Sequence, residues 1–206
     1  MKFWPSLKPR GTPLVAKTDA GSVAATLPYI AEYVAAIDRT ERFGFEAPPR
    51  LLIRKPCVDM RAVLPVLLDF YETHSPGELL GQTLAIHFAL IPRLYDNTGI
   101  HLNLTIGWMV HQGKPIFPHD EGLIRRFVAG GRKVWIHEGC PFHLWMTSLA
   151  CEILDVTFAM NLGHPQTREQ CAKRIIYQPA DEPAGHLVYH PTLVGPNFFL
   201  KTGAVL

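Results

Sequence analysis

Residues 134–158, VWIHEGCPFHLWMTSLACEILDVTF, decide the fold of this chain. Their apolar pattern predicts two short strands joined by a turn near Ala150, with His143 and Trp145 on the first strand and Asp155 near the end of the second. When two strands pair antiparallel, the start of one lies beside the end of its neighbour. We therefore expect the imidazole of His143 to contact the carboxylate of Asp155.

Such a pair predicts proton-transfer chemistry. A carboxylate that is bonded to an imidazole fixes its tautomer and orients it as a general base and acid. The structural alternative is a strand-end aspartate that bonds only to its own turn. Asp155 stands between apolar residues, and a buried carboxylate without a partner is costly. The expected burial of Asp155 therefore favours a pair with His143.

The composition indicates a single globular domain. The chain has 206 residues, of which 48% are hydrophobic and 18% are charged, so it can bury one sizeable core. Its formal net charge of +2, with basic residues scattered along the chain, predicts neither a nucleic-acid partner nor an anionic membrane as partner. We expect an extended arm over residues 1–22, which are rich in Pro, Lys and Gly, and one domain over residues 23–206.

The four cysteines predict free thiols and no disulfide scaffold, because Cys57, Cys140, Cys151 and Cys171 fall at no paired spacing. The N-terminus, MKFWPSLKPRGTP, lacks the continuous apolar segment of a secretory signal. No apolar run reaches the ~18 residues of a membrane span. These features predict a cytoplasmic protein, or one exported by a dedicated non-classical route.

The predicted elements are helices first and then an antiparallel sheet, which indicates an α+β domain with helices packed on one face of the sheet. Ser75–Glu78 has the form of a capping box and precedes a buried helix that ends at the turn Asn97–Gly99. The predicted helices cover residues 23–40, 57–73 with an interruption near Pro65, 79–95, 119–128 and 167–174; the predicted strands outside the opening segment cover residues 51–54, 100–110, 115–117 and 187–194.

Four short motifs between Gly81 and Phe158 occur in an order that resembles the transglutaminase-like superfamily of papain-fold enzymes. That family has a Gly-Gln-Cys helix start, a strand that runs from Gly-Ile to Gly-aromatic, a His-x-Trp strand and an aliphatic-Asp-x-Thr strand. The corresponding segments here are Gly81-Gln82-Thr83, Gly99-Ile100 through Gly107-Trp108, His143-Leu144-Trp145 and Leu154-Asp155-Val156-Thr157.

The resemblance implies a papain-like or transglutaminase-like fold, in which N-terminal helices pack on the antiparallel sheet. It implies His143 as the general base and acid, oriented by Asp155. The family's nucleophile is a cysteine at the start of the buried helix, where the helix dipole lowers a thiol pKa. Here that position holds Thr83, or Ala85 if the register shifts so that Ala89 matches the family's small residue one turn on.

Other residues are expected around the catalytic cleft by the same resemblance. Gln82 and the backbone N–H groups at the helix start would form an oxyanion site. His87 lies within a turn of both nucleophile positions, so it is expected to line the site. From their sequence context alone, Trp145 and Trp108 are expected either in the core or as walls of the cleft.

The implied function is thiol-dependent acyl transfer at an amide bond, with no cofactor. The enzyme would be a peptidase, amidase, deamidase or transglutaminase acting on a peptide, protein or peptidoglycan substrate, of a kind that bacteria use as effectors. Neither an internal threonine nor an alanine supplies thiolate chemistry. The chain is then either a natural pseudoenzyme or a variant whose nucleophile was replaced.

Three alternatives remain open at this point. A non-catalytic binding protein would keep the cleft and lack the chemistry. A substitute thiol would be Cys57, at a predicted helix start, or Cys140, three residues before His143. A small zinc-binding domain would use His137, Cys140 and His143, with Cys151 as a fourth ligand.

Overall fold

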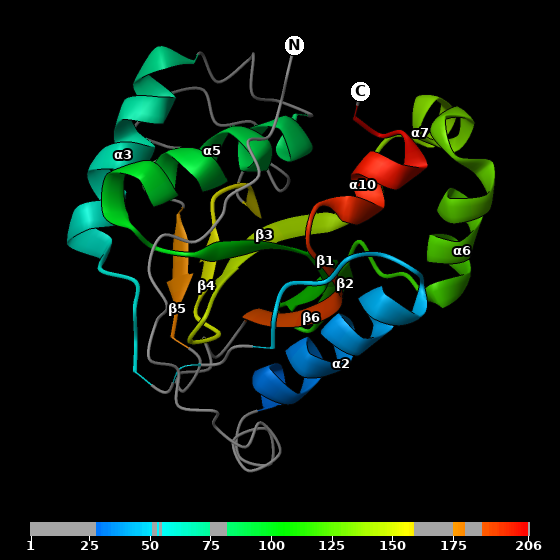
Figure 1. Cartoon of the computed structure of the whole chain (residues 1–206), viewed down its shortest axis with the longest axis horizontal. Coiled ribbons are helices and arrows are strands. Elements are labelled where there is room, and N and C mark those ends of the chain that lie inside the picture. The colour runs from blue at the N-terminus through cyan, green and yellow to red at the C-terminus, as the bar shows by residue number, and fades with distance from the viewer. Residues whose placement is uncertain are drawn as a thin grey trace.

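The computed structural model describes residues 28–50, 53, 55–74, 82–158, 175–179 and 187–205. In these residues the chain forms an α+β fold, with helices packed around a curled antiparallel sheet (Figure 1). Several predicted features lie outside the described residues: the arm over 1–22, the capping box at 75–78, the helix over 167–174 and all but one residue of the strand over 51–54.

The described elements follow one another as helices, a hairpin, two helices and then the remaining strands. Their bounds are α2 Pro28–Arg42, α3 Met60–Thr73, α5 Thr83–Thr98, β1 Leu102–His111, β2 Lys114–Ile116, α6 Glu121–Gly130, α7 Arg132–Glu138, β3 His143–Ser148, β4 Ile153–Asp155, β5 Ile176–Gln178, β6 Leu187–Val194 and α10 Asn197–Thr202.

The sheet is antiparallel throughout its described pairs. Its strand order is β2-β1-β3-β4-β5, and β6 also pairs with β1. The register between β1 and β3 places Gly107 opposite His143, and the register between β3 and β4 places Leu154 opposite Met146. The start of β3 and the end of β4 therefore lie at the same end of the sheet, as the predicted contact between His143 and Asp155 requires.

Most of the predicted elements in the described part are confirmed. The hairpin of β1 and β2, the two central strands β3 and β4, and the last strand β6 occupy the predicted segments. Helix α5 ends at Gly99, whose φ of 71° is a left-handed conformation that glycine adopts without steric cost. Periodicity and turn residues were sufficient signals for these elements.

The segment 134–158 was predicted to form two strands, and this is wrong for its first residues, because 134–138 belong to helix α7. The consecutive apolar residues Val134, Trp135 and Ile136 lie in a helix and not in a strand. The ring of Trp135 packs against Phe127 of α6 and Phe198 of α10, at centroid distances of 4.3 and 5.6 Å. Burial of this one large side chain against distant partners outweighs the local pattern.

Helix α3 starts later than predicted. It begins at Met60, because the side chain of Asp59 accepts a hydrogen bond from the backbone N–H of Arg61 and caps the helix. Cys57 therefore does not lie at a helix start. The expected interruption at Pro65 is also wrong, since Pro65 lies inside the continuous helix.

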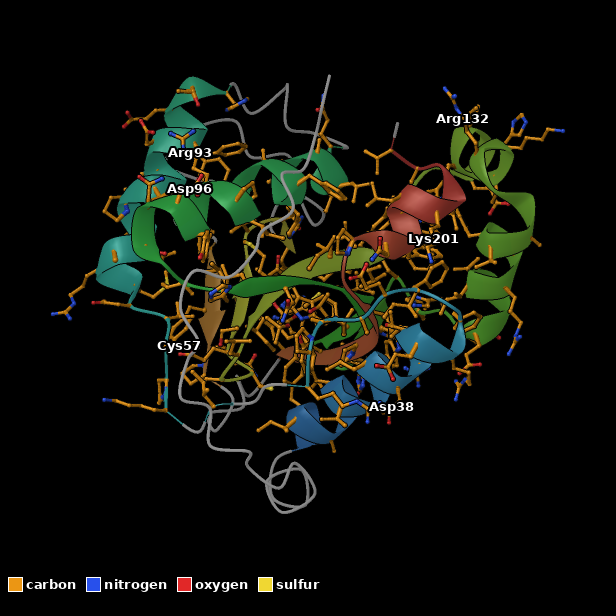
Figure 2. The ribbon with its side chains drawn as sticks, in the orientation of Figure 1. Asp38, Cys57, Arg93, Asp96, Arg132 and Lys201 are labelled. Carbon is orange, nitrogen blue, oxygen red and sulfur yellow. The ribbon has the colours of Figure 1, made fainter. Side chains whose placement is uncertain are left out.

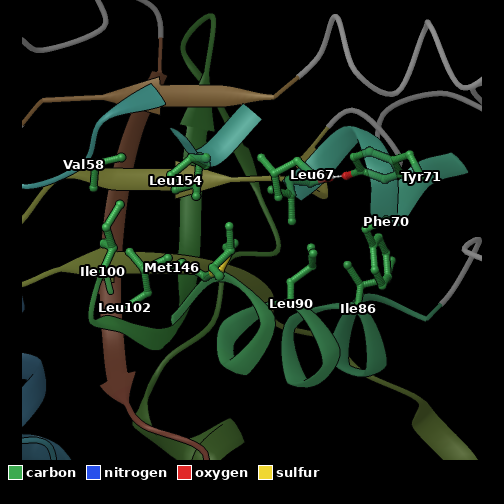
Figure 3. Close-up of a cluster of buried hydrophobic side chains, with 13 residues drawn as sticks. Val58, Leu67, Phe70, Tyr71, Ile86, Leu90, Ile100, Leu102, Met146 and Leu154 are labelled. Carbon is green, nitrogen blue, oxygen red and sulfur yellow. Dashed lines mark hydrogen bonds between the residues drawn. The ribbon is translucent and has the colours of Figure 1, made fainter. Parts of the chain in front are cut away.

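One face of the sheet is covered by α3 and α5 (Figure 3). Leu67 of α3 and Leu90 of α5 are fully buried and pack with Met146 of β3 and Leu154 of β4. A second buried cluster continues along this face, where Leu144 of β3 packs with side chains of α6 and α10. Burial of these apolar surfaces is the main stabilising contribution to the fold.

The other face of the sheet is covered by α2, so the expectation that helices pack on one face only is wrong (Figure 1). The hydroxyl of Tyr29 bonds to Thr147 at 2.8 Å, and Asn103 donates to the hydroxyl of Tyr33 at 3.2 Å. Because successive side chains of a strand face opposite sides, these contacts belong to the face turned away from α5.

No helix in the described part is long and apolar enough to cross a membrane.

Candidate functional site

The predicted contact between His143 and Asp155 is confirmed. His143 is the first residue of β3 and Asp155 is the last residue of β4. The Nε2–H of His143 donates to Oδ2 of Asp155 at 2.6 Å, and both side chains are 0% exposed. This hydrogen bond assigns the Nε2 proton to the side of the carboxylate, so Nδ1 is the unprotonated nitrogen of the neutral ring.

Asp155 is held on both of its oxygens. Oδ1 accepts from the backbone N–H groups of Thr157 and Phe158, each at 2.9 Å. Oδ2 accepts from the hydroxyl of Tyr189 at 3.0 Å in addition to His143. Burial alone would raise the pKa of Asp155, but the charge and hydrogen bond of His143 and the N–H of Thr157 outweigh burial, and the pKa lies below its ordinary value. Asp155 is therefore ionised and fixed in position at neutral pH.

Four aromatic rings surround the imidazole of His143. Trp145 stacks on it at 5.7 Å, and Tyr189 and Phe158 each lie with their centroids 6.3 Å away. Phe117 lies parallel to it, at 6.1 Å with an interplanar angle of 5°. These rings exclude water from the pair, which strengthens its electrostatic interaction.

Phe117 holds an unusual backbone conformation. Its φ is 54°, in the left-handed region that a phenylalanine rarely adopts. The Nδ1–H of His119 donates to the carbonyl of Phe117 at 2.9 Å, while Nε2 of His119 is 3.1 Å from the hydroxyl of Thr192 in β6. A hydrogen bond from a residue anchored on β6 therefore maintains the strained position of the ring over His143.

We expect Phe117→Ala to open the imidazole of His143 to solvent. Without the parallel ring, deuterium exchange at Cε1 of His143 should rise several-fold, as measured by mass spectrometry after incubation in D₂O. Phe117→Gly should give the same exchange but be more stable than Phe117→Ala by about 1 kcal/mol, because glycine relieves the positive φ. Exchange at exposed His101 is the internal control. Unchanged exchange at His143 in both variants would show that Phe117 does not cover it.

A hydrogen-bonded chain extends from this site toward α2. Nε1–H of Trp145 donates to the hydroxyl of Tyr29 at 2.8 Å. Tyr29 bonds to Thr147, and Thr147 bonds to Thr105 at 2.7 Å. Trp145, which was predicted in the core or as a cleft wall, is 0% exposed and packs beside the His143–Asp155 pair.

The two predicted nucleophile positions lie on different sides of α5. Thr83 is half-buried and is one helical turn before buried His87, so these residues share a face. Ala85 is exposed, like Ala89 one turn further on, and Gln82 is exposed at the helix N-cap. None of the hydrogen bonds of the described residues joins Thr83, Ala85 or Gln82 to His143.

Helix α5 approaches the pair from the opposite face of the sheet. Leu144 and Met146 pack in the clusters to which α5 contributes, whereas His143 and Trp145 face Tyr189 and Tyr29. Helix α5 runs along the sheet before the chain enters β1. Ile86, near the start of α5, lies at one end of the buried cluster, and Leu102, at the start of β1, lies towards the other end (Figure 3). Sixteen helical residues span about 24 Å, close to the ~20 Å from the start of β1 to Gly107. The starts of α5 and β3 therefore lie at the same end of the sheet.

His87 is the residue of α5 that interacts with the pair. It is 0% exposed, and its charge state is coupled to those of Asp155 and His143. The pKa of His87 is lowered to about 4, mainly by burial and also by the neighbouring His143, against the opposing effects of the Thr83 carbonyl and Asp155. His87 is therefore neutral at physiological pH, and its predicted place near the site agrees with this coupling.

Trp108 is not brought to this site. It stacks on His190 at 4.1 Å, and His190 bonds through Nδ1 to Glu32 of α2 at 2.9 Å. Its neighbour Gly107 pairs with His143, so strand alternation turns Trp108 to the other face of β1. Trp108 therefore does not line the His143–Asp155 pair.

The described thiols do not lie in the surroundings that activate a cysteine nucleophile, because burial raises the pKa of each. Cys57 lies in the connection to α3 (Figure 2), and its Sγ donates to Glu152 at 3.2 Å. Burial raises the pKa of Cys57 and raises that of Cys151 to about 12. The thiol of Cys140 donates to the carbonyl of Phe142, at 3.6 Å. Cys171 lies outside the described residues.

The proposed zinc ligands do not converge. His143 is committed to Asp155, His137 lies in α7 and is exposed, and Cys151 is buried in another cluster. Among the described residues there is no group of three or more His, Cys, Asp or Glu side chains that could hold a metal ion.

Tyr189, Phe117 and Tyr29 were missed by the sequence analysis. Tyr189 lies in the predicted last strand, and its alternation with exposed Val188 marked it as inward-facing. Phe117 follows the predicted hairpin, but nothing in the local sequence indicates that it reaches His143.

No family model, no curated protein and no solved structure matches this chain.

Proposed function

We propose that His143 and Asp155 form the acid–base half of an acyl-transfer site of the transglutaminase-like type, acting on an amide bond of a peptide, protein or peptidoglycan. The buried hydrogen bond of 2.6 Å between them carries this proposal. It makes Asp155 the group that would orient the imidazole, and Nδ1 would be the nitrogen that exchanges a proton with a nucleophile.

The chain order supports the same proposal. The buried helix α5, the strand β1, the His143 strand and the Asp155 strand follow one another as in the family that the motifs resemble. Thr83 is half-buried and shares a helix face with His87, which interacts electrostatically with Asp155 and His143. We therefore assign the nucleophile position to Thr83 and not to exposed Ala85. Acyl transfer of this kind needs a thiolate, a proton acceptor and oxyanion donors, and no cofactor.

A second candidate function is that the same site binds a partner without catalysing a reaction. The observation that favours it is the chemistry at the helix start, because threonine has no accessible pKa and alanine has no nucleophilic atom. Such a protein would bind an amide-containing partner without turnover.

Installing cysteine separately at Thr83 and Ala85 distinguishes the two functions. If the site is of the acyl-transfer type, Thr83→Cys should react with iodoacetamide at pH 6.5 about tenfold faster than a free thiol, because His143 stabilises the thiolate. His143→Ala in the same chain should remove this acceleration. The reaction rate at each site is read by mass spectrometry of the alkylated peptides.

Ala89→Cys is the matched control, since Ala89 is exposed on the same helix one turn after Ala85. Cysteine there should react as a free thiol whether or not His143 is present. If Thr83→Cys and Ala85→Cys both behave like Ala89→Cys, the acyl-transfer proposal fails and the binding function replaces it.

A further inference from the structure

His87 interrupts an otherwise apolar surface. Its neighbours on the sheet-facing side of α5 are Ile86, Leu90 and Leu94, all buried. A leucine at this position would continue the surface and need no hydrogen bonds. In the described part of the chain, Nε2 of His87 is one of two buried side-chain polar atoms without a hydrogen-bond partner, the other being Oε1 of Gln178.

The contacts of His87 define which ring nitrogen carries the proton. Nδ1 lies 2.7 Å from the carbonyl oxygen of Thr83. A carbonyl only accepts, so Nδ1 carries the hydrogen and donates it. With the imidazole neutral, Nε2 presents a lone pair. The atom without a partner is therefore a buried acceptor.

A buried acceptor of this kind destabilises the fold unless it receives a hydrogen bond. The chemistry of the lone pair restricts the donor. A fully deprotonated anion has no proton to donate, and a hydrogen-bearing anion would bring a charge into the core. A metal ion would need further ligands that the described residues do not gather around His87. A neutral O–H or N–H group satisfies the nitrogen without bringing a charge into the core.

We infer that Nε2 of His87 accepts a hydrogen bond from a small neutral donor bound beneath the first turn of α5. The donor is either a water molecule or the N–H of a primary amide. The inference does not require the acyl-transfer proposal, because the acceptor needs a donor whether or not the chain has a nucleophile. If the donor is an amide, His87 would orient the amide nitrogen of a substrate near the His143–Asp155 pair.

The test is the ¹⁵N spectrum of the histidine rings in the intact protein. The Nε2 signal of His87, identified by its loss in His87→Leu, should lie upfield of a bare imidazole acceptor, because an accepted hydrogen bond moves it toward the protonated position. His119 supplies a matched reference: it also donates through Nδ1 to a carbonyl, and its Nε2 lies 3.1 Å from the hydroxyl of Thr192. Thr192→Val removes that donor and gives the reference position of a nitrogen that has lost its partner.

Acetamide then separates the two donors. A further, saturable shift of the His87 Nε2 signal on titration with acetamide identifies an amide site; no change identifies a water molecule. The inference is overturned if the His87 Nε2 signal lies at the position of a bare acceptor, or if Nε2 carries the proton and Nδ1 does not. The result is independent of the cysteine experiment, which reports on Thr83 and His143.

Discussion

Glu152→Ala is expected to lower the free energy of unfolding by about 3–5 kcal/mol, because several buried donors lose one shared acceptor. Glu152 is 1% exposed. Its carboxylate accepts from the N–H of Cys57 at 3.0 Å, the N–H of Val58 at 3.1 Å, the hydroxyl of Ser148 at 2.8 Å and the hydroxyl of Tyr177 at 2.6 Å. It thereby joins the segment before α3 to the β3–β4 turn and to β5.

Urea unfolding followed by tryptophan fluorescence measures this change. Glu72→Ala is the control, since Glu72 is an exposed glutamate and its loss should change stability by less than about 0.5 kcal/mol. Tyr177→Phe removes one donor and should cost about 1 kcal/mol. Equal stability of Glu152→Ala and Glu72→Ala would show that the Glu152 contacts do not hold the fold together.

The same carboxylate makes the fold sensitive to acid. Burial would raise the pKa of Glu152, but hydrogen bonds from Tyr177, the Cys57 N–H and Ser148 outweigh it, and the pKa is lowered. The unfolded state then binds the proton first as the pH falls. Stability from Glu152 is complete above the ordinary glutamate pKa and is lost as the pH falls through the lowered pKa of the folded state.

Asp155→Ala is expected to have an effect of similar size, about 3–5 kcal/mol, because it leaves His143, Tyr189 and two backbone N–H groups without their acceptor. Asp155→Asn is expected to keep most of the stability and change the chemistry. The amide oxygen can still accept from Thr157 and Phe158, but the amide nitrogen would donate toward Nε2 of His143. The proton of His143 must then move to Nδ1, so the imidazole can no longer accept a proton there.

Asp155→Asn in the Thr83→Cys chain should therefore abolish the His143-dependent acceleration of alkylation at pH 6.5, while urea unfolding remains cooperative. Tyr189→Phe is the matched control, because it removes a donor to the same oxygen without forcing the tautomer change. If Thr83→Cys keeps its reactivity in the Asp155→Asn background, Asp155 does not orient His143.

The parts of the site that the sequence predicted depend on short-range relations. His143 and Asp155 are separated by one turn between two short strands, so alternation and antiparallel pairing were enough to place them together. The same reasoning placed β1, β2 and β6, because each strand is bounded by turn residues. Ala85 and Thr83 could not be separated in sequence, since only the packing of α5 decides which helix face is covered.

The missed parts depend on partners far away in the chain. Trp135 belongs to a helix because Phe198 and Phe199, more than sixty residues later, pack against it. Tyr189 reaches Asp155 only because β6 pairs with β1 and curls beside β3. Short β5 and α10 carry too few residues for a periodic pattern, and Trp108 required knowledge of the register at Gly107.

The contacts between α2 and β6 have a consequence for the order of folding during synthesis. Glu32 bonds to His190, Arg39 donates to the carbonyl of Thr192, and the N–H of Val194 donates to Thr40. The first described helix thus docks on the last described strand, and β1 receives its partner β6 only when residues 187–194 have left the ribosome. Until then the Asp155 side of the sheet lacks Tyr189, so we expect the nascent chain to depend on late, long-range closure and to fold slowly.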